Sequence, residues 1–204
     1  LLDALEFVGT QMIGNAAKAC KEELAMFGIE QPLIPTSVPR LTLREAQKIV
    51  STRTGRDLTS ELDLNPEDEK EICQWAKEEH QSDFVTINHF PNKKIAFYTL
   101  PDPEVPEYSL SYDLLFRGIE ISSGSQRIND YDQLITVMQE RGFDPANFEI
   151  YLQAFKYGMP PEGGFSFGLE RITMKLLELK NVREASLFPR DMERVDIRLS
   201  TLKS

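Results

Sequence analysis

The sequence has little of the material from which disulfide, zinc or histidine-based sites are built. Its 204 residues include two cysteines, Cys20 and Cys73, and two histidines, His80 and His89. The cysteines lie far apart and form no CxxC pair, which argues against a disulfide framework or a zinc site and indicates the cytoplasm. Two histidines leave little for a catalytic triad or a histidine metal cluster.

Long apolar runs and an excess of basic residues are also missing. No stretch of 18 apolar residues occurs, so no membrane span is predicted. The net charge of −10 disfavours a stand-alone nucleic-acid-binding module. The first residues include early acids and no basic segment, unlike a signal peptide. Because the chain opens with leucine and is helical at once, we expect a fragment of a longer protein.

The first third of the chain is predicted to be mostly helical. An apolar stripe at steps of three and four predicts a helix over 1–27, closed by Gly28. Three prolines in 29–41 predict an extended linker or edge strand. Two further helices follow, over 43–51 and 66–80.

Both of these helices carry strong start signals. Thr42 with Glu45 three residues later matches a capping box. Asn65 precedes Pro66 and a run of acids, the expected cap, first position and first turn of a helix. We expect residues 42–80 to form a small helical insertion into the main body.

From residue 83 the pattern changes to strands. Alternating apolar residues over 83–127 predict an antiparallel meander of four strands, with PNKK as one hairpin turn and Arg117-Gly118 as another. Helices are predicted over 130–141 and 146–157. A glycine-rich strand, an abrupt helix and a short apolar strand closing on Pro189 and Arg190 then follow.

Polar residues in a predicted strand form the first candidate site. Glu120 and Ser123 could hold Mg²⁺ if a nucleotide supplied other oxygens. Gln126 and Arg127 end the same strand, and an arginine can grip a carboxylate through two hydrogen bonds. The alternative is a Glu–Arg pair on a solvated sheet face. Strict alternation puts Glu120 and Arg127 on opposite faces, so a common face needs a bulge, which we place at Gly124.

The second candidate site is the glycine-rich junction before the last helix. Gly168 leaves the backbone bare and Arg171 lies in the first helical turn, an arrangement that suits a flat ligand carrying phosphates. The alternatives are a turn that needs glycine only for packing, and an arginine paired with Glu170 or Glu178. Tyr98 is a third candidate, or else a strand residue with an exposed hydroxyl.

Together these segments resemble a known family. GGFSFGLERITMKLLELKNVREASLFPRD resembles motif 3 of class II aminoacyl-tRNA synthetases. FYTLPDP, SYDLLFRGIEISSGSQRI, KYGMPPEGGFSFGLER and ASLFPRD resemble the aspartyl enzymes of the archaeal and eukaryotic type. The asparaginyl enzymes share GLER and a KYG segment, but TLPDP and ASLFPRD fit the aspartyl pattern better. The resemblance is clear over 83–191 and weaker over 1–82. It implies an α/β (α+β) fold with a mostly antiparallel sheet flanked by helices.

The resemblance implies a role for each candidate. Glu120 and Ser123 would hold Mg²⁺ on the ATP phosphates, Arg171 would contact the terminal phosphates, and Gly168 would let the nucleotide approach. Of these four residues, Glu120 and Arg171 would be catalytic.

The aspartate pocket would use three other residues. Arg127 would hold the side-chain carboxylate, with Tyr98 and Gln126 lining the pocket. The aspartate α-carboxylate would attack the ATP α-phosphate to give aspartyl-adenylate and pyrophosphate. A tRNA 3′-terminal hydroxyl would then accept the aspartyl group.

The chain departs from the family pattern by what it lacks. Motif 1 at the dimer interface, motif 2 with its phosphate-binding arginine and the anticodon-binding barrel are absent. Residues 1–204 therefore resemble the C-terminal part of a catalytic domain, from a cytoplasmic enzyme expected to be a homodimer, and we expect this piece alone to be inactive. Three alternatives remain: a ligase making asparagine from aspartate, an asparaginyl-tRNA synthetase, and a non-catalytic paralogue.

Overall fold

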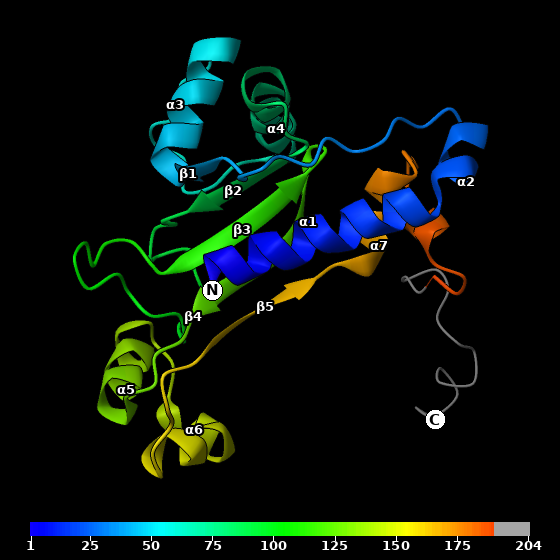
Figure 1. Ribbon diagram of the computed structural model, residues 1–204. Helices are drawn as coiled ribbons and strands as arrows, with labels where there is room; N and C mark the ends of the chain where they lie inside the picture. Colours follow the sequence, from blue (N-terminus) through cyan, green and yellow to red (C-terminus); the bar gives the residue numbers. More distant parts are fainter. Residues whose placement is uncertain (190–204) are drawn as a thin grey trace, which may run out of the picture.

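A single five-stranded sheet forms the centre of the molecule (Figure 1). The computed structural model describes residues 1–189. The strands follow one another across the sheet in chain order: β1 (Arg40–Thr42), β2 (Phe84–Asn88), β3 (Ser111–Phe116), β4 (Ile119–Gln126) and β5 (Gly163–Phe167). The β1–β2 pair is parallel and the other three pairs are antiparallel. This confirms the expected mostly antiparallel sheet.

Helices cover both faces of the sheet and one end of it (Figure 1). The α-helices are α1 (Leu2–Ala19), α2 (Lys21–Met26), α3 (Leu43–Thr54), α4 (Pro66–His80), α5 (Tyr131–Glu140), α6 (Glu149–Lys156) and α7 (Leu169–Leu176). Two short 3₁₀ helices, η1 (Pro145–Phe148) and η2 (Val182–Ala185), complete the described elements. No helix among residues 1–189 combines the length and apolar character needed to cross a membrane.

The first face of the sheet packs on α3 and α4. Val85, Ile87 and Leu115 from the sheet are buried against Leu43 and Ile72 from the two helices. Because side chains alternate along a strand, β2 supplies every second residue to this core. The stretch 42–80 is thus joined to the sheet by a common core, and its origin as an insertion stays a prediction.

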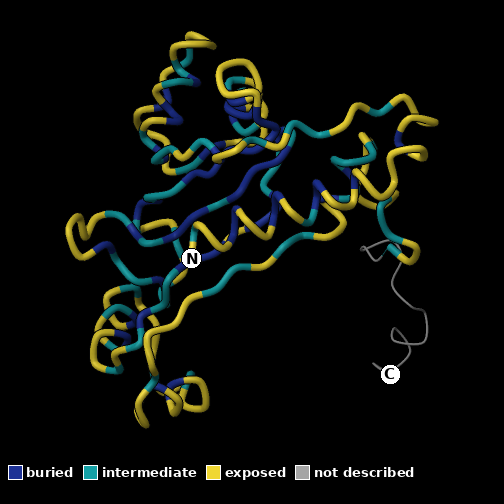
Figure 2. The backbone as a smooth tube through the Cα atoms, viewed as in Figure 1, coloured by how far each residue is buried: buried dark blue, intermediate teal, exposed yellow. Residues whose placement is uncertain are grey.

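The opposite face packs on α1 and α7. Phe84 and Leu114 from the sheet meet Leu5 of α1 and Ile172 of α7 in a second core. Burial on both faces explains why β2 and β3 are dark along most of their length in Figure 2. A strand buried on both sides shows an apolar run, as LLF does here; in FVTI the one polar residue, Thr86, donates its hydroxyl to Glu6 Oε1 at 2.9 Å.

A third, smaller core lies beyond one end of the sheet. Helices α5 and α6 enclose Leu134, Met138 and Phe155, and aromatic residues of the irregular segment 89–110 pack against them. This core anchors that segment next to the end of β4, where Arg127 follows.

The start signals read from the sequence are confirmed. Thr42 accepts a hydrogen bond from the Glu45 amide and Glu45 reciprocates, while Asn65 caps α4 ahead of Pro66. Arg117 and Gly118 both have positive φ angles, +47° and +83°, as a tight β3–β4 hairpin requires.

Two element predictions in the first two thirds of the chain were wrong. The helix expected over 1–27 is interrupted at Cys20, which separates α1 from α2. No regular strand forms over 94–101, so the expected four-stranded meander does not exist and β2 pairs directly with β3. Prolines on both sides of that segment lack the amide that a ladder needs, and only isolated bridges such as Thr99–Arg127 form.

The chain after α7 also differs from the prediction. The short apolar strand expected before Pro189 is replaced by η2 and an irregular stretch whose Leu187 and Phe188 are 93% and 86% exposed. Arg190 lies outside the described residues.

Candidate functional site

A β-bulge in β4 brings the strand candidates to one face. Leu114 of β3 pairs with Ser122 and the next residue, Leu115, pairs with Glu120, so Ile121 is the extra residue of the bulge. We expected a bulge at Gly124, and it lies at Ile121 instead. The bulge has the expected effect: the side chain of Glu120 lies on the same face of the sheet as those of Ser123 and Arg127.

These residues line one cavity of about 320 Å³ on the sheet face that also carries α3 and α4. Tyr98, Glu120, Ser123 and Arg127 all contribute to its wall. The irregular segment 89–110 contributes part of the lining. Four candidates from two separate parts of the sequence therefore meet at one place.

Arg127 is held by neutral groups. Its Nη1 donates to Ser125 Oγ at 2.6 Å, and its guanidinium carbon lies 4.6 Å from the centre of the Tyr98 ring. The Ile128 amide donates to the Tyr98 carbonyl at 2.9 Å. This hydrogen bond holds the segment that carries Tyr98 next to the end of β4. None of the acids in the described part of the chain forms an ion pair with Arg127, so its charge is available to a ligand carboxylate.

Sequence reasoning missed Asp113, which pairs with Ser123 across the sheet and lines the same cavity. The run SYDLLF predicts an ordinary alternating strand. The signal for a site is the acid among otherwise buried strand residues. Burial, and next the charge of Glu120, raise the pKa of Asp113 to about 7. Two carboxylates and the Ser123 hydroxyl form an all-oxygen donor set, which fits Mg²⁺ shared with phosphate oxygens.

Lys94 was also missed, because it was assigned to a hairpin turn. It lies at the rim of the cavity and forms an ion pair with Asp63, which lines the cavity as well. Burial lowers the pKa of Lys94, while the charges of Asp113 and Glu120 oppose that shift. The cavity thus has a second cation facing its acidic wall.

Arg171 contacts the site from α7. Its Nη1 donates to the Glu120 carbonyl at 2.8 Å and lies 3.4 Å from Glu120 Oε1, so it pairs with neither Glu170 nor Glu178. The Gly168 amide donates to the Ile121 carbonyl at 2.8 Å, which attaches the start of α7 to the bulge. Gly168 has an ordinary φ of −80°, so no left-handed conformation explains the glycine.

Glu69 of α4 accepts a hydrogen bond from the backbone of Glu120. The Glu120 amide donates to Glu69 Oε2 at 3.3 Å. Burial raises the pKa of Glu69, and the charge of Glu120 adds to that effect. Glu69 does not line the cavity, so its role is to accept from the backbone of Glu120.

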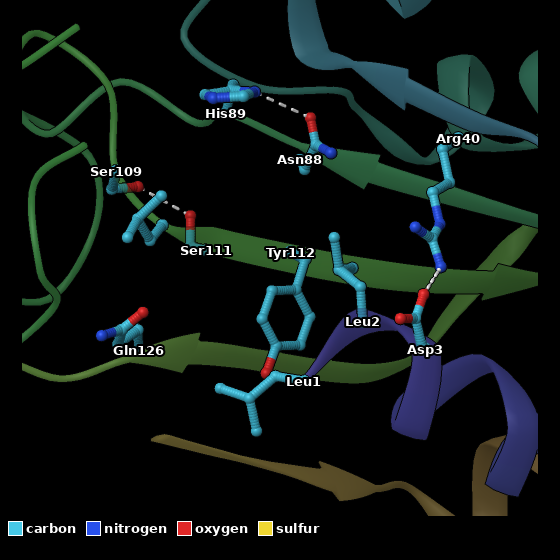
Figure 3. Close-up of a pocket in the computed structure, with 11 residues that line it drawn as sticks. Leu1, Leu2, Asp3, Arg40, Asn88, His89, Ser109, Ser111, Tyr112 and Gln126 are labelled. Carbon is cyan, nitrogen blue, oxygen red and sulfur yellow. Dashed lines mark hydrogen bonds and ion pairs between the residues drawn. The ribbon is translucent and has the colours of Figure 1, made fainter. Parts of the chain in front are cut away.

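Gln126 is not part of this cavity. Its neighbours Ser125 and Arg127 point to the site, and Gln126 itself lines a separate cavity of about 400 Å³ beside the start of α1. Figure 3 shows Tyr112 in the middle of that cavity, between Gln126 and the Arg40–Asp3 ion pair. Alternation along β4 accounts for the separation.

Comparison with known proteins gives consistent matches. Residues 1–192 match the family model for class II tRNA synthetases (D, K and N). An aspartate–tRNA(Asp/Asn) ligase of Thermus thermophilus is 42% identical over 185 residues, which are 91% of this chain and 43% of the relative.

Two solved structures match as well. An aspartyl-tRNA synthetase from Entamoeba histolytica has a TM-score of 0.87 at 35% identity, covering 96% of this chain and 41% of that one. An asparaginyl-tRNA synthetase from Pyrococcus horikoshii, complexed with asparaginyl-adenylate, has a TM-score of 0.82 at 30% identity, covering 95% of this chain and 44% of that one. The chain spans less than half the length of these relatives, and within that span it belongs to the class II tRNA synthetase family of the aspartyl, lysyl and asparaginyl enzymes.

Proposed function

We propose that the protein containing this chain is an aspartate–tRNA ligase that uses ATP and Mg²⁺. The observation that carries the proposal is the unpaired guanidinium of Arg127 in the same cavity as Asp113 and Glu120. Arg127 can bind a carboxylate ligand, and Asp113 and Glu120 in the same cavity can bind the metal ion of a nucleotide. Adenylate formation needs both ligands in one place.

The residues divide the work between the two substrates. Arg127 would bind the side-chain carboxylate of aspartate, on a wall formed by Tyr98. Asp113, Glu120 and Ser123 would hold the metal, which neutralises phosphate charge when bound. Arg171 would orient the terminal phosphates from the edge, next to Gly168. Gln126 lines another cavity, and its predicted contact with aspartate would need a different conformation.

The proposed reaction needs no side-chain nucleophile. An oxygen of the aspartate α-carboxylate forms a bond to the α-phosphorus of ATP as the bond to pyrophosphate breaks. The tRNA 3′-terminal hydroxyl then attacks the acyl carbon, its proton is released, and AMP leaves. Catalysis rests on positioning and charge neutralisation by Arg127, Arg171 and the metal site.

Asparagine is the second candidate substrate, because asparaginyl enzymes share the fold. Arg127 favours aspartate, since a guanidinium binds a carboxylate through two charge-assisted bonds and an amide offers only one neutral acceptor. An enzyme that makes free asparagine from aspartate would use the same adenylate. Assays with and without tRNA separate it from a tRNA ligase.

ATP–pyrophosphate exchange tests the proposal in the protein of full family length. Aspartate should support exchange and asparagine should not. Arg127→Ala should abolish aspartate-dependent exchange while ATP still binds. Arg53→Ala, in the last turn of α3, should leave it unchanged, because Arg53 pairs with Glu71 and Glu78 and does not line the cavity. Normal aspartate activation by Arg127→Ala would overturn the assignment. We expect residues 1–204 alone to show no exchange.

The remaining assignments are proposals that rest on family membership. The protein would act as a homodimer and bind the acceptor end of tRNA. A cytoplasmic location agrees with Cys20 and Cys73, which are both free thiols.

A further inference from the structure

A second polar cavity lies where the β3–β4 turn meets α4 and α7. Its volume is about 370 Å³. Four cations line it: Arg117 from the turn, Lys70 and Lys77 from α4, and Lys175 from α7. They come from three elements that are distant in the sequence, in a chain whose net charge is −10. This concentration of positive charge needs a physical explanation.

The acids of the cavity do not balance the lysines. Asp83 is occupied, because it accepts from Arg117 Nε at 2.9 Å and from the Leu33 amide at 3.1 Å. Glu178 lies 3.7 Å from Arg117 Nη1 and is 60% exposed. The third acid, Glu30, is exposed. Within residues 1–189, none of the three lysines forms an ion pair with an acid of this cavity.

Two of the cations are partly withdrawn from water. Lys175 is half-buried, and burial first, then the charge of Lys70, lower its pKa. Arg117 has a side chain that is 14% exposed: its Nε donates to Asp83, its Nη2 donates to the Glu30 carbonyl at 2.9 Å, and its buried Nη1 lies 3.7 Å from Glu178 Oε1. Arg117 is therefore compensated by its own neighbours, and the three lysines carry the charge that faces the cavity.

We propose that this cavity binds a small oxyanion of the phosphate class. Such an ion presents several acceptor oxygens within a few ångströms, which allows one ligand to accept from more than one of the three lysines. A carboxylate offers two oxygens and serves fewer of these donors. The site is separate from the cavity that holds Arg127, although Lys175 follows Arg171 by one helical turn on α7.

Titration of the chain with inorganic phosphate and with pyrophosphate, at constant ionic strength set by sodium chloride, tests the proposal. Amide resonances of Gly118 and Lys175 should shift and saturate with at least one of the two ions. The ion should also raise the melting temperature, and the increase should grow with ion concentration, because the ion binds the folded chain and not the unfolded one. Absence of saturable shifts with both ions would overturn the proposal.

Two variants and a control locate the site. Lys175→Met keeps the apolar stem and removes the charge, and it should weaken binding roughly tenfold, as does loss of one charge-assisted hydrogen bond. Lys77→Met, on the exposed face of α4, should act in the same direction without disturbing the core. Lys180→Met, an exposed lysine that does not line the cavity, should bind like the wild type. Equal affinity in all three variants would place the anion elsewhere and contradict the proposal.

Discussion

The guanidinium of Arg127 lies over the ring of Tyr98, 4.6 Å from its centre. The two residues come from a strand end and from an irregular segment, and a bridge between Thr99 and Arg127 joins the two pieces of backbone. The ring supports the arginine without neutralising it, because a cation–π contact leaves the charge in place. The charge of Arg127 thus remains open to the cavity that it lines.

Replacing Tyr98 should affect affinity more than folding. Tyr98→Ala removes the aromatic support, worth about 0.5–2 kcal/mol, and should raise the KM for aspartate in ATP–pyrophosphate exchange roughly threefold to thirtyfold. Tyr98→Phe keeps the ring and should stay within about twofold of wild type. A large defect in Tyr98→Phe with a mild one in Tyr98→Ala would show that the hydroxyl matters and the ring does not.

Lys94 should contribute to the same site. It is the second cation at the cavity, and it faces Asp113 and Glu120. Lys94→Met should raise the KM for aspartate or ATP by roughly tenfold, the value of one charge-assisted contact. Lys93→Met is the matched control, because the neighbouring lysine is exposed and does not line the cavity. Similar kinetics for both variants would remove Lys94 from the site.

The sequence predicted the helix starts and the polar residues of β4 better than the segment before β3. Caps at Thr42 and Asn65 are local, so three or four residues specify them. The segment 94–101 has strand-forming residues, but tertiary contacts with α5 and α6 decide its conformation.

The candidate site was predictable only in part, because some of its residues are marked by local sequence and others depend on strand pairing. Glu120, Ser123 and Arg127 could be read as a group because polar residues in a strand need an explanation. Asp113 escaped notice because its neighbours are apolar, and only the sheet register places it opposite Ser123. The bulge at Ile121 depends on pairing with β3, which no local pattern specifies.

Asp68 should be important for stability because it is an acid that is 1% exposed. It forms an ion pair with Arg56, and its Oδ2 accepts from the Asn65 amide at 3.2 Å. Asp68→Ala removes both acceptors and should lower the free energy of unfolding by about 2–4 kcal/mol, measured by urea denaturation. Glu67→Ala changes an exposed acid in the same turn and should cost under about 0.5 kcal/mol. Equal losses would contradict this role.

The capping box of α3 should add a pH-dependent term to stability. Hydrogen bonds from the Thr42 amide, and next from its hydroxyl, hold the pKa of Glu45 below its ordinary value of 4.5. A depressed carboxyl pKa in the folded state stabilises the protein above the unfolded pKa, and the contribution is lost as the pH falls through the folded value.

The contribution is small because Glu45 is exposed, at most about 1 kcal/mol. Glu45→Ala should therefore reduce the free energy of unfolding at pH 7, and the difference from wild type should shrink progressively as the pH falls below 4.5. A difference between variant and wild type that persists at low pH would show that the carboxylate charge is not responsible.

The two cysteines should react at very different rates in the folded chain. Cys20 is exposed at the break between α1 and α2. Cys73 is 5% exposed, on the face of α4 that packs into the core. Burial raises the pKa of Cys73 to about 12, and only the thiolate reacts. At pH 8 a thiol reagent should modify one cysteine quickly and the second at least about a hundredfold more slowly, with both fast in urea. Cys20→Ser should remove the fast phase of the native protein, and a fast phase that survives this change would mean that α4 opens readily from the sheet.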